Sequence, residues 1–153
     1  MNWVYFEDIE LHRKDDLGKY TVDKDEVIEF ARKWDPQPFH IDEEAAQSFP
    51  SGGIIAPAIY TLGIVNKLAV ESDSVVAALA GFGWDEVRFP HPVYPGDTIH
   101  VTAECIDRRL SESRRDAGII RSLIEVRNQH DVVCLSFKST YLVAKRAPEQ
   151  ENG

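Results

Sequence analysis

Two residues with acid/base chemistry, Asp35 and His40, lie five positions apart in the stretch 35–42, Asp-Pro-Gln-Pro-Phe-His-Ile-Asp. A carboxylate and an imidazole that meet at a reacting centre can take up and deliver protons, which is the basis of general acid/base catalysis. The two prolines exclude regular secondary structure, so the pair is expected to meet through a stiff loop. The stretch therefore predicts a proton-transfer site on a rigid mount.

Two helices are expected to hold this loop. The first begins at a capping box, residues 23–26, and its apolar positions recur at helical spacing: Val27, Phe30, Ala31 and Trp34. Pro36 ends it, because the residue before a proline is pushed out of the helical region, and here that residue is Asp35. The acidic residues 42–44 then favour the first turn of a second, short helix that runs to about Ser48.

A third helix, expected from Ala56 to Val70, is apolar on nearly every side. Pro57 suits its first helical position, and its length predicts a span of about 22 Å. A helix of this kind must be surrounded by protein, and only the C-terminal half of the chain can supply it.

The C-terminal half has the alternation of long strands, with turns at residues 95–97, 116–118 and 128–131. A further strand is expected between Val75 and Phe89, and its glycines indicate a bulge or bend. A short strand, 19–22, precedes the first helix. These elements predict an α+β fold in which a long antiparallel sheet wraps around a buried central helix.

Composition narrows the function further. The 153 residues suit a single domain, 1–153, with a frayed tail from about residue 147. A net charge of −9 without a basic run argues against nucleic-acid or anionic-membrane partners. Cys105 and Cys134 fall in predicted strands without metal-ligand spacing, which favours buried reduced thiols and a cytoplasmic protein. No signal peptide or membrane-spanning segment is visible, and no metal site is expected.

With these elements in order, the stretch 35–42 resembles the hydratase motif Asp-x-Asn-Pro-x-His-x-Asp of MaoC-like dehydratases and (R)-specific enoyl-CoA hydratases. Gln37 stands where that family usually has Asn. The segment 83–97, which includes Gly-Trp-Asp-Glu-Val-Arg-Phe-Pro and Pro-Val-Tyr-Pro-Gly-Asp, resembles the strand and turn after the central helix in one branch of the family. The resemblance covers roughly Lys19 to Lys145 and implies the hot-dog fold.

The resemblance implies hydration or dehydration of 2-enoyl and 3-hydroxyacyl thioesters, with Asp35 and His40 as the catalytic dyad and either one as the base. Pro57 and Ala58 stand where the family typically has His-Gly or Ser-Gly, so the Ala58 N–H is expected to bind the thioester oxygen. Tyr60, further along the helix, is a candidate for lining the substrate pocket. Coenzyme A is expected only as part of the substrate, with no redox cofactor, and a homodimer or larger assembly is implied.

Two alternatives to this function remain. A hot-dog thioesterase would carry a carboxylate on or near the central helix, and residues 56–70 contain none. A non-catalytic acyl-thioester binding module is favoured by the departure at Pro57 and Ala58.

Several other side chains have two interpretations. His91, between two prolines, is expected to be an exposed turn residue. The arginines could bind coenzyme A phosphates, although a solvated surface cluster is the commoner interpretation: Arg108, Arg109, Arg114 and Arg115. The aromatic residues Trp34, Phe82 and Trp84 are expected to pack in the protein interior and not to form an acyl tunnel.

Overall fold

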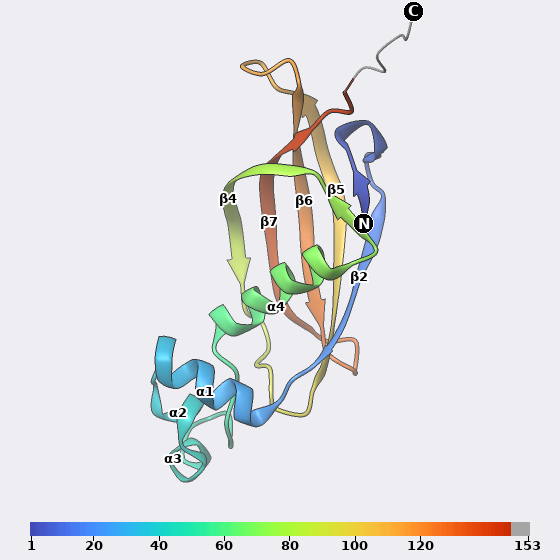
Figure 1. The fold of residues 1–153 in the computed structure, drawn as a ribbon. Coiled ribbons are helices and arrows are strands. Elements are labelled where there is room, and N and C mark those ends of the chain that lie inside the picture. The colour runs from blue at the N-terminus through green and yellow to red at the C-terminus, as the bar shows by residue number, and fades with distance from the viewer. Residues whose placement is uncertain (148–153) are drawn as a thin grey trace, which may run out of the picture.

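The computed structural model describes residues 1–147 (Figure 1). Its strands are β1 (Asn2–Val4), β2 (Lys14–Thr21), β3 (Ser74–Val76), β4 (Ala78–Arg88), β5 (Thr98–Leu110), β6 (Ala117–Arg127) and β7 (Val133–Ala144). Its helices are the single 3-10 turn η1 (Phe6–Asp8), α1 (Lys24–Trp34), α2 (Pro38–Ile41), α3 (Glu43–Gln47) and α4 (Ala58–Glu71). The part of the predicted frayed tail beyond residue 147 lies outside the described residues.

Five strands form one antiparallel sheet in the order β2-β5-β6-β7-β4, and β1 pairs with β3 in a short parallel ribbon. Figure 1 shows α4 lying across one face of this sheet, with α1, α2 and α3 gathered at one end. The core forms where α4 meets the strands, and its buried residues include Ile64, Val65, Val101 and Leu135. This long sheet around a central helix confirms the predicted α+β, hot-dog fold.

The central helix α4 is less enclosed than its composition suggests. Its buried residues are Tyr60, Thr61, Ile64 and Val65, whereas Ile59 and Val70 are exposed. The sheet covers only one side of the helix, so the prediction of a helix surrounded by its own chain is wrong for this single chain. Its outer side is mixed in character, since the exposed residues include Asn66 and Lys67 beside Ile59 and Val70.

Helix α1 begins as predicted, because the Asp23 carboxylate accepts a hydrogen bond from the Glu26 N–H. Its residues Val27 and Ala31 are fully buried. Trp34, however, is 61% exposed, with the Lys33 ammonium 5.2 Å from its ring centroid. The prediction that Trp34 packs inside is therefore wrong.

The stretch 35–42 is more regular than its prolines suggest. Pro38 starts the one-turn helix α2, which carries His40. A proline fits the first position of a helix, because the N–H that it lacks would have no partner there. Asp42 then caps α3 by accepting a hydrogen bond from the Ala45 N–H at 3.1 Å. The prediction of an irregular loop is thus wrong, and the short helix α3 is confirmed.

Strand β4 forms one edge of the sheet and has the irregular register that its glycines predict, with shifts at Ala78/Ala80, Gly81/Gly83 and Asp85/Arg88. Phe82 is 57% exposed, which contradicts the prediction that it packs inside. Trp84 is also largely exposed, although its ring lies 5.2 Å from that of Phe137. An edge strand has only one neighbour, so side chains on its outer side find little of this chain to contact.

Both cysteines, Cys105 and Cys134, are free and buried, as predicted, and burial raises the pKa of each thiol. Within residues 1–147, no helix has the length and apolar character needed to cross a membrane.

Gly118 on β6 provides a test of the packing under the N-terminal segment. A Cβ added there would overlap the Phe6 ring, whose Cγ would lie 2.7 Å away. We expect Gly118→Ala to lower the free energy of unfolding by about 1–3 kcal/mol, since Phe6 must leave its buried position. Denaturant unfolding measures this, with Gly63→Ala as the control, because an added Cβ there meets no atom outside its own helix and neighbouring residues within 4 Å and should not lower stability. Equal stability of Gly118→Ala and the wild type would contradict the packing.

Candidate active site

A cavity of about 680 Å³ opens beside the start of α4. Its walls come from the segment between α1 and α4, from the first turn of α4, from the chain after β4 and from the start of β7. The residues that line it are Asp35, Gln37, Phe39, His40, Phe49, Pro50, Ser51, Ile55, Ala56, Ala58, Thr61, Phe89, His91, Pro92, Val93, Tyr94 and Cys134. The predicted dyad and Ala58 thus meet in one cavity.

Asp35 occupies the C-cap position of α1, where its N–H donates to the Ala31 carbonyl at 2.8 Å. The Gln37 side-chain amide donates to Asp35 Oδ1 at 2.9 Å. This bond occupies one carboxylate oxygen and orients the other, Oδ2, toward His40. Gln37, which replaces the usual Asn of the motif, therefore has a positioning contact of its own.

His40 is held in a defined tautomer by the backbone. Its ring is 4% exposed, and its Nδ1 lies 2.6 Å from the Ile55 carbonyl oxygen. A carbonyl oxygen can only accept, so Nδ1 must carry a proton, and Nε2 has the lone pair in the neutral imidazole. Nε2 lies 3.4 Å from Asp35 Oδ2. The two side chains are therefore close enough to exchange a proton, directly or through a bound water.

The start of α4 supplies a free donor to the cavity. Pro57 is the N-cap residue, and Ala58 is the first helical residue. Within residues 1–147, no protein acceptor pairs with the Ala58 N–H, as expected for the first turn of a helix. Ala56, two residues before Ala58, is also held in place, because its N–H donates to the Val93 carbonyl at 2.8 Å. The arrangement combines a proton-transfer pair with a positively polarised helix start.

Comparison with known proteins shows the family of this chain. The family model described as "MaoC like domain" matches residues 10–126. The chain belongs to the MaoC-like family. Among solved structures, it is similar to the crystal structure of a MaoC-like dehydratase from Rhodospirillum rubrum. The two chains are 32% identical, and their superposition has a TM-score of 0.88 and covers 94% of this chain and 99% of that one.

Two curated relatives of this MaoC-like chain are similar over most of their length. The protein YdeM of Bacillus subtilis, which is uncharacterized, is 34% identical over 128 residues, or 81% of this chain and 87% of the relative. The 3-hydroxybutyryl-CoA dehydratase of Methylorubrum extorquens is 31% identical over 113 residues, or 73% of this chain and 69% of the relative.

The structure does not bring Tyr60 or Pro57 to the cavity wall of this MaoC-like protein. The Tyr60 hydroxyl instead donates to Glu26 Oε1 at 2.6 Å, and the Tyr20 hydroxyl donates to the same oxygen at 2.6 Å. Burial raises the pKa of the Tyr60 phenol most, and the hydrogen bond to Glu26 raises it further. The network joins α4 to α1, whose last turn leads to Asp35. Tyr60 therefore has a structural contact in place of the predicted substrate contact.

Sequence reasoning missed several lining residues. His91 was expected to be an exposed turn residue, but it is partly buried and lines the cavity. Thr61 also lines it, and its spacing of three from Ala58, which places both on one helix face, could have identified it. Tyr94 and Cys134 come from distant segments, and no local pattern indicates them.

Tyr94 is positioned by a buried turn. The Asp97 carboxylate accepts hydrogen bonds from the Tyr94 N–H and from the Gln129 side-chain amide, both at 2.9 Å. The Tyr94 hydroxyl then donates to the Ser51 carbonyl at 3.0 Å. These bonds link the segment after β4 to the loop before α4, so two walls of the cavity are held together.

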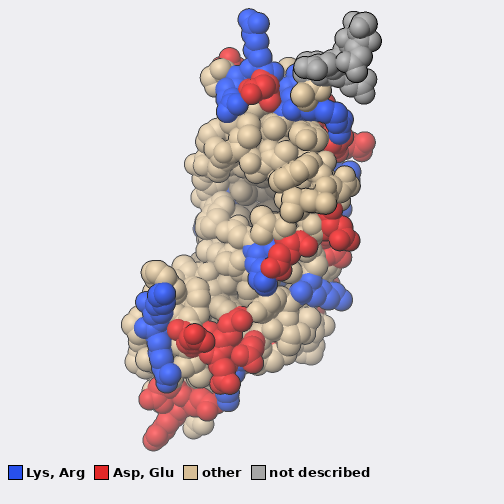
Figure 2. Space-filling view, viewed as in Figure 1, with Lys and Arg blue, Asp and Glu red and all other residues tan. Residues whose placement is uncertain are grey.

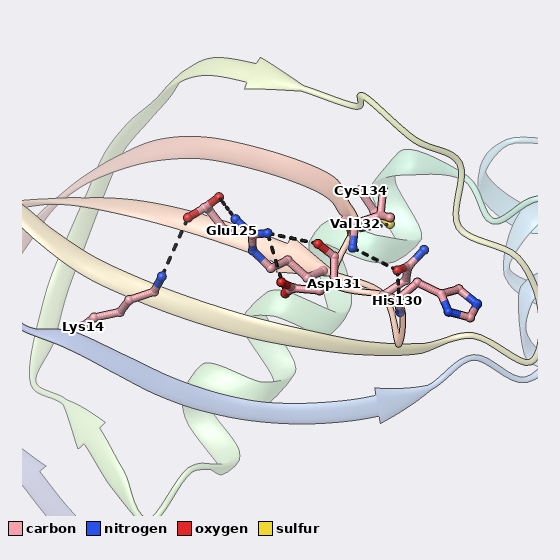
Figure 3. A network of polar contacts seen from close by, with 8 residues as sticks. Lys14, Glu125, His130, Asp131, Val132 and Cys134 are labelled. Carbon is pink, nitrogen blue, oxygen red and sulfur yellow. Dashed lines mark hydrogen bonds and ion pairs between the residues drawn. The ribbon is translucent and has the colours of Figure 1, made fainter.

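Cys134 is positioned by the turn between β6 and β7 (Figure 3). The Asn128 side-chain oxygen accepts from the N–H groups of His130 and Val132, and the Val132 carbonyl accepts from the Cys134 thiol at 3.5 Å. Arg127 pairs with Glu125, two residues earlier on β6. The Cys134 thiol is therefore a neutral, hydrogen-bonded part of the wall.

The arginine cluster lies at the end of the sheet that is far from the cavity (Figure 1). Figure 1 shows the connection between β5 and β6, which contains residues 111–116, at the end of the sheet opposite α1–α3. Arg114 pairs there with Asp116, and Arg108 donates to the Phe6 carbonyl at 3.1 Å. These contacts favour the surface interpretation over phosphate binding at the cavity of the same chain.

Proposed function

We propose that the protein hydrates 2-enoyl thioesters and, in the reverse direction, dehydrates 3-hydroxyacyl thioesters. The observation that carries this proposal is the 3.4 Å separation of Asp35 Oδ2 and His40 Nε2 in a cavity that Ala58 also lines. Hydration needs a group that removes a proton from water, a group that protonates C2 and a donor for the thioester oxygen. The cavity contains candidates for all three roles.

The dyad suits a water molecule as its reactant. The neutral His40 Nε2 and the ionised Asp35 Oδ2 are both acceptors, so a water between them can donate one hydrogen to each. As the water oxygen bonds to C3 of the enoyl group, one acceptor takes its proton and the protonated dyad delivers a proton to C2. No proton is gained or lost overall. At 3.4 Å the two groups act as a coupled pair, and the dyad is the unit that acts as acid and base.

The negative charge that develops on the thioester oxygen is assigned to Ala58. Its N–H is unpaired and belongs to the first turn of a helix of 14 residues, whose dipole favours negative charge at that end. A dry cavity strengthens such a contact. Mostly apolar walls, including Phe39, Ile55 and Val93, suit an acyl group bound next to this donor.

The relatives support this chemistry. The 3-hydroxybutyryl-CoA dehydratase is 31% identical to this chain, and its name specifies an acyl-CoA substrate. The thioesterase alternative lacks support, because the acidic residue of α4, Glu71, is its last residue and does not line the cavity. The non-catalytic alternative predicts binding of acyl thioesters without turnover.

One assay separates the three functions. The protein is incubated with crotonyl-CoA, and the loss of enoyl absorbance and the release of free thiol are followed together. Loss of absorbance without thiol release supports hydration, whereas thiol release indicates a thioesterase. Binding of crotonyl-CoA by calorimetry without either signal would overturn the proposal in favour of a binding module. Other short enoyl thioesters extend the assay beyond one acyl length.

We also propose a homodimer that pairs through the β4 edge. The seven residues 78–84 carry no charge, and Leu79, Phe82 and Trp84 are exposed on them. The opposite edge strand, β2, carries the charged residues that discourage edge pairing, including Lys14, Asp15 and Asp16. Figure 2 shows a mostly uncharged surface on the side of the view where β4 lies, whereas charged side chains lie at the two ends and across the middle of the other side. Since β4 leads into Phe89 and His91, such an interface would lie near the cavity.

This interface predicts that Phe82→Lys converts a dimer of about 35 kDa, twice the chain mass of 17.3 kDa, into a monomer. The buried lysine would have no partner, which disfavours association. Light scattering coupled to gel filtration measures the mass. Leu110→Lys is the matched control, because Leu110 is 60% exposed on β5 and should leave the dimer intact. A Phe82→Lys protein that remains dimeric would rule out pairing through this edge.

A further inference from the structure

The hydroxyl group of Thr61 is a polar group of the cavity wall that the proposed reaction does not use. Thr61 lies on α4, is 3% exposed and lines the cavity. Its backbone N–H bonds to the Pro57 carbonyl at 3.3 Å. Within residues 1–147, its side-chain oxygen has no hydrogen-bonding partner in the protein. A threonine in a helix can satisfy its hydroxyl on a preceding carbonyl, and Thr61 does not.

The other polar side chains of the cavity wall differ from Thr61 in this respect. Those with partners are Asp35 and Gln37, which bond to each other, His40 with the Ile55 carbonyl, Ser51 with the Gly53 carbonyl, Tyr94 with the Ser51 carbonyl, and Cys134 with the Val132 carbonyl. His91 has no such bond among the described residues, but it is partly exposed to solvent. Thr61 is therefore the buried polar side chain of the described wall that is left for a ligand.

The place of Thr61 along α4 indicates which part of a ligand it meets. Three residues of helix separate it from Ala58 by about 4.5 Å along the axis. The Ala58 N–H donates beyond the helix start, so we place the thioester oxygen there and assign the Thr61 hydroxyl, which lies one turn further on, to a different part of the ligand. Coenzyme A ends in a charged nucleotide, which favours solvent over the mostly apolar walls of the cavity. We therefore expect the Thr61 hydroxyl to face the acyl chain beyond the reacting carbons.

We propose that Thr61 makes the site selective for acyl thioesters that carry a hydroxyl or carbonyl oxygen at C4 or C5. This inference rests on the proposed function, and it names the class of acyl chain for the same cavity. An apolar acyl chain removes water from the Thr61 hydroxyl and leaves it unpaired, whereas an oxygenated chain replaces the lost hydrogen bond. The apolar neighbours Ala56 and Val93 offer no such bond through their side chains.

Two pairs of nearly isosteric substrates test the selectivity. The first pair is trans-2-hexenoyl-CoA and trans-5-hydroxy-2-pentenoyl-CoA, and the second is 4-methyl- and 4-hydroxy-2-pentenoyl-CoA. Within a pair, a methyl group replaces a hydroxyl group. We expect Thr61→Val to shift the ratio of kcat/KM toward the methyl compound by roughly 5- to 150-fold in at least one pair. Inductive effects of the substrate hydroxyl cancel, because each ratio is compared between two enzymes.

Thr61→Ser keeps the hydroxyl and serves as the matched control, with a ratio close to that of the wild type. Unchanged ratios in both pairs for Thr61→Val would overturn the inference. Dissociation constants of the saturated analogues, hexanoyl-CoA and 5-hydroxypentanoyl-CoA with 4-methyl- and 4-hydroxypentanoyl-CoA, are measured by calorimetry on the same proteins. A shift in their affinity ratio supports the Thr61 contact even if the wild type hydrates no enoyl thioester, which would overturn only the proposed function. No shift in turnover or affinity rejects the contact.

Discussion

Asp35→Asn and His40→Gln are each expected to lower kcat for hydration by about 10²–10⁴-fold, because a positioned acid/base group typically contributes that factor. An asparagine at position 35 can still accept the bond from Gln37, but it cannot take a proton from water. A glutamine at position 40 can still donate to the Ile55 carbonyl, but its other end has no basic nitrogen. Both variants therefore test proton transfer with little change in side-chain volume.

Asp42→Asn is the matched control for these variants. Asp42 belongs to the same motif, but it caps α3 and does not line the cavity. Asparagine is as good an N-cap residue as aspartate, so turnover and stability should remain near those of the wild type. Steady-state kinetics with crotonyl-CoA and thermal unfolding are measured for all three variants. Full activity in a folded Asp35→Asn protein would contradict the assignment of the dyad.

The double variant adds a separate readout. If Asp35 and His40 act as one unit, removing both should cost little more than removing one, because effects within a catalytic unit are not additive. Independent roles would instead multiply the two losses. The comparison tests the coupling that the 3.4 Å separation implies.

Much of the fold could be predicted from the sequence because local patterns and tertiary packing agree. The capping residue Asp23, the proline after Asp35 and the alternation along β6 each act within a few residues. The same is true of the pairing between residue types at positions 35 and 40, which share one short segment. These features predict the two residue types of the dyad and the helices around them, whereas their place beside the start of α4 was implied by the family resemblance.

The remaining parts of the site depend on contacts between distant segments. The tautomer of His40 is set by the Ile55 carbonyl, and Ile55 is held through Ala56 by Val93. Tyr60 lies on the predicted helix, but not on the face that lines the cavity. Its hydroxyl bonds to Glu26, which is 34 residues away in the sequence, and no local pattern predicts such a contact. The prediction that Phe82 is buried fails for a similar reason. Composition shows that Phe82 is apolar, but it does not show that the sheet ends at β4.

Ala58→Pro is expected to lower kcat by about 10²–10³-fold, the usual cost of removing one oxyanion donor. Proline is well suited to the first position of a helix, and Ala58 occupies that position in α4. Pro57 has φ of −57° and ψ of 144°, an extended conformation that the residue before a proline favours. The substitution therefore removes the N–H while the helix start can keep its geometry.

Ala58→Gly is the matched control, since it retains the N–H and removes only the methyl group. We expect its activity to equal or exceed that of the wild type, because the thioester can approach the amide more closely. Loss of turnover in Ala58→Pro with unchanged thermal stability, beside an active Ala58→Gly, would assign the developing negative charge to this amide. A folded Ala58→Pro protein with normal kcat would instead require another donor for the thioester oxygen. The dyad would then keep its role, while the start of α4 would serve only to shape the cavity.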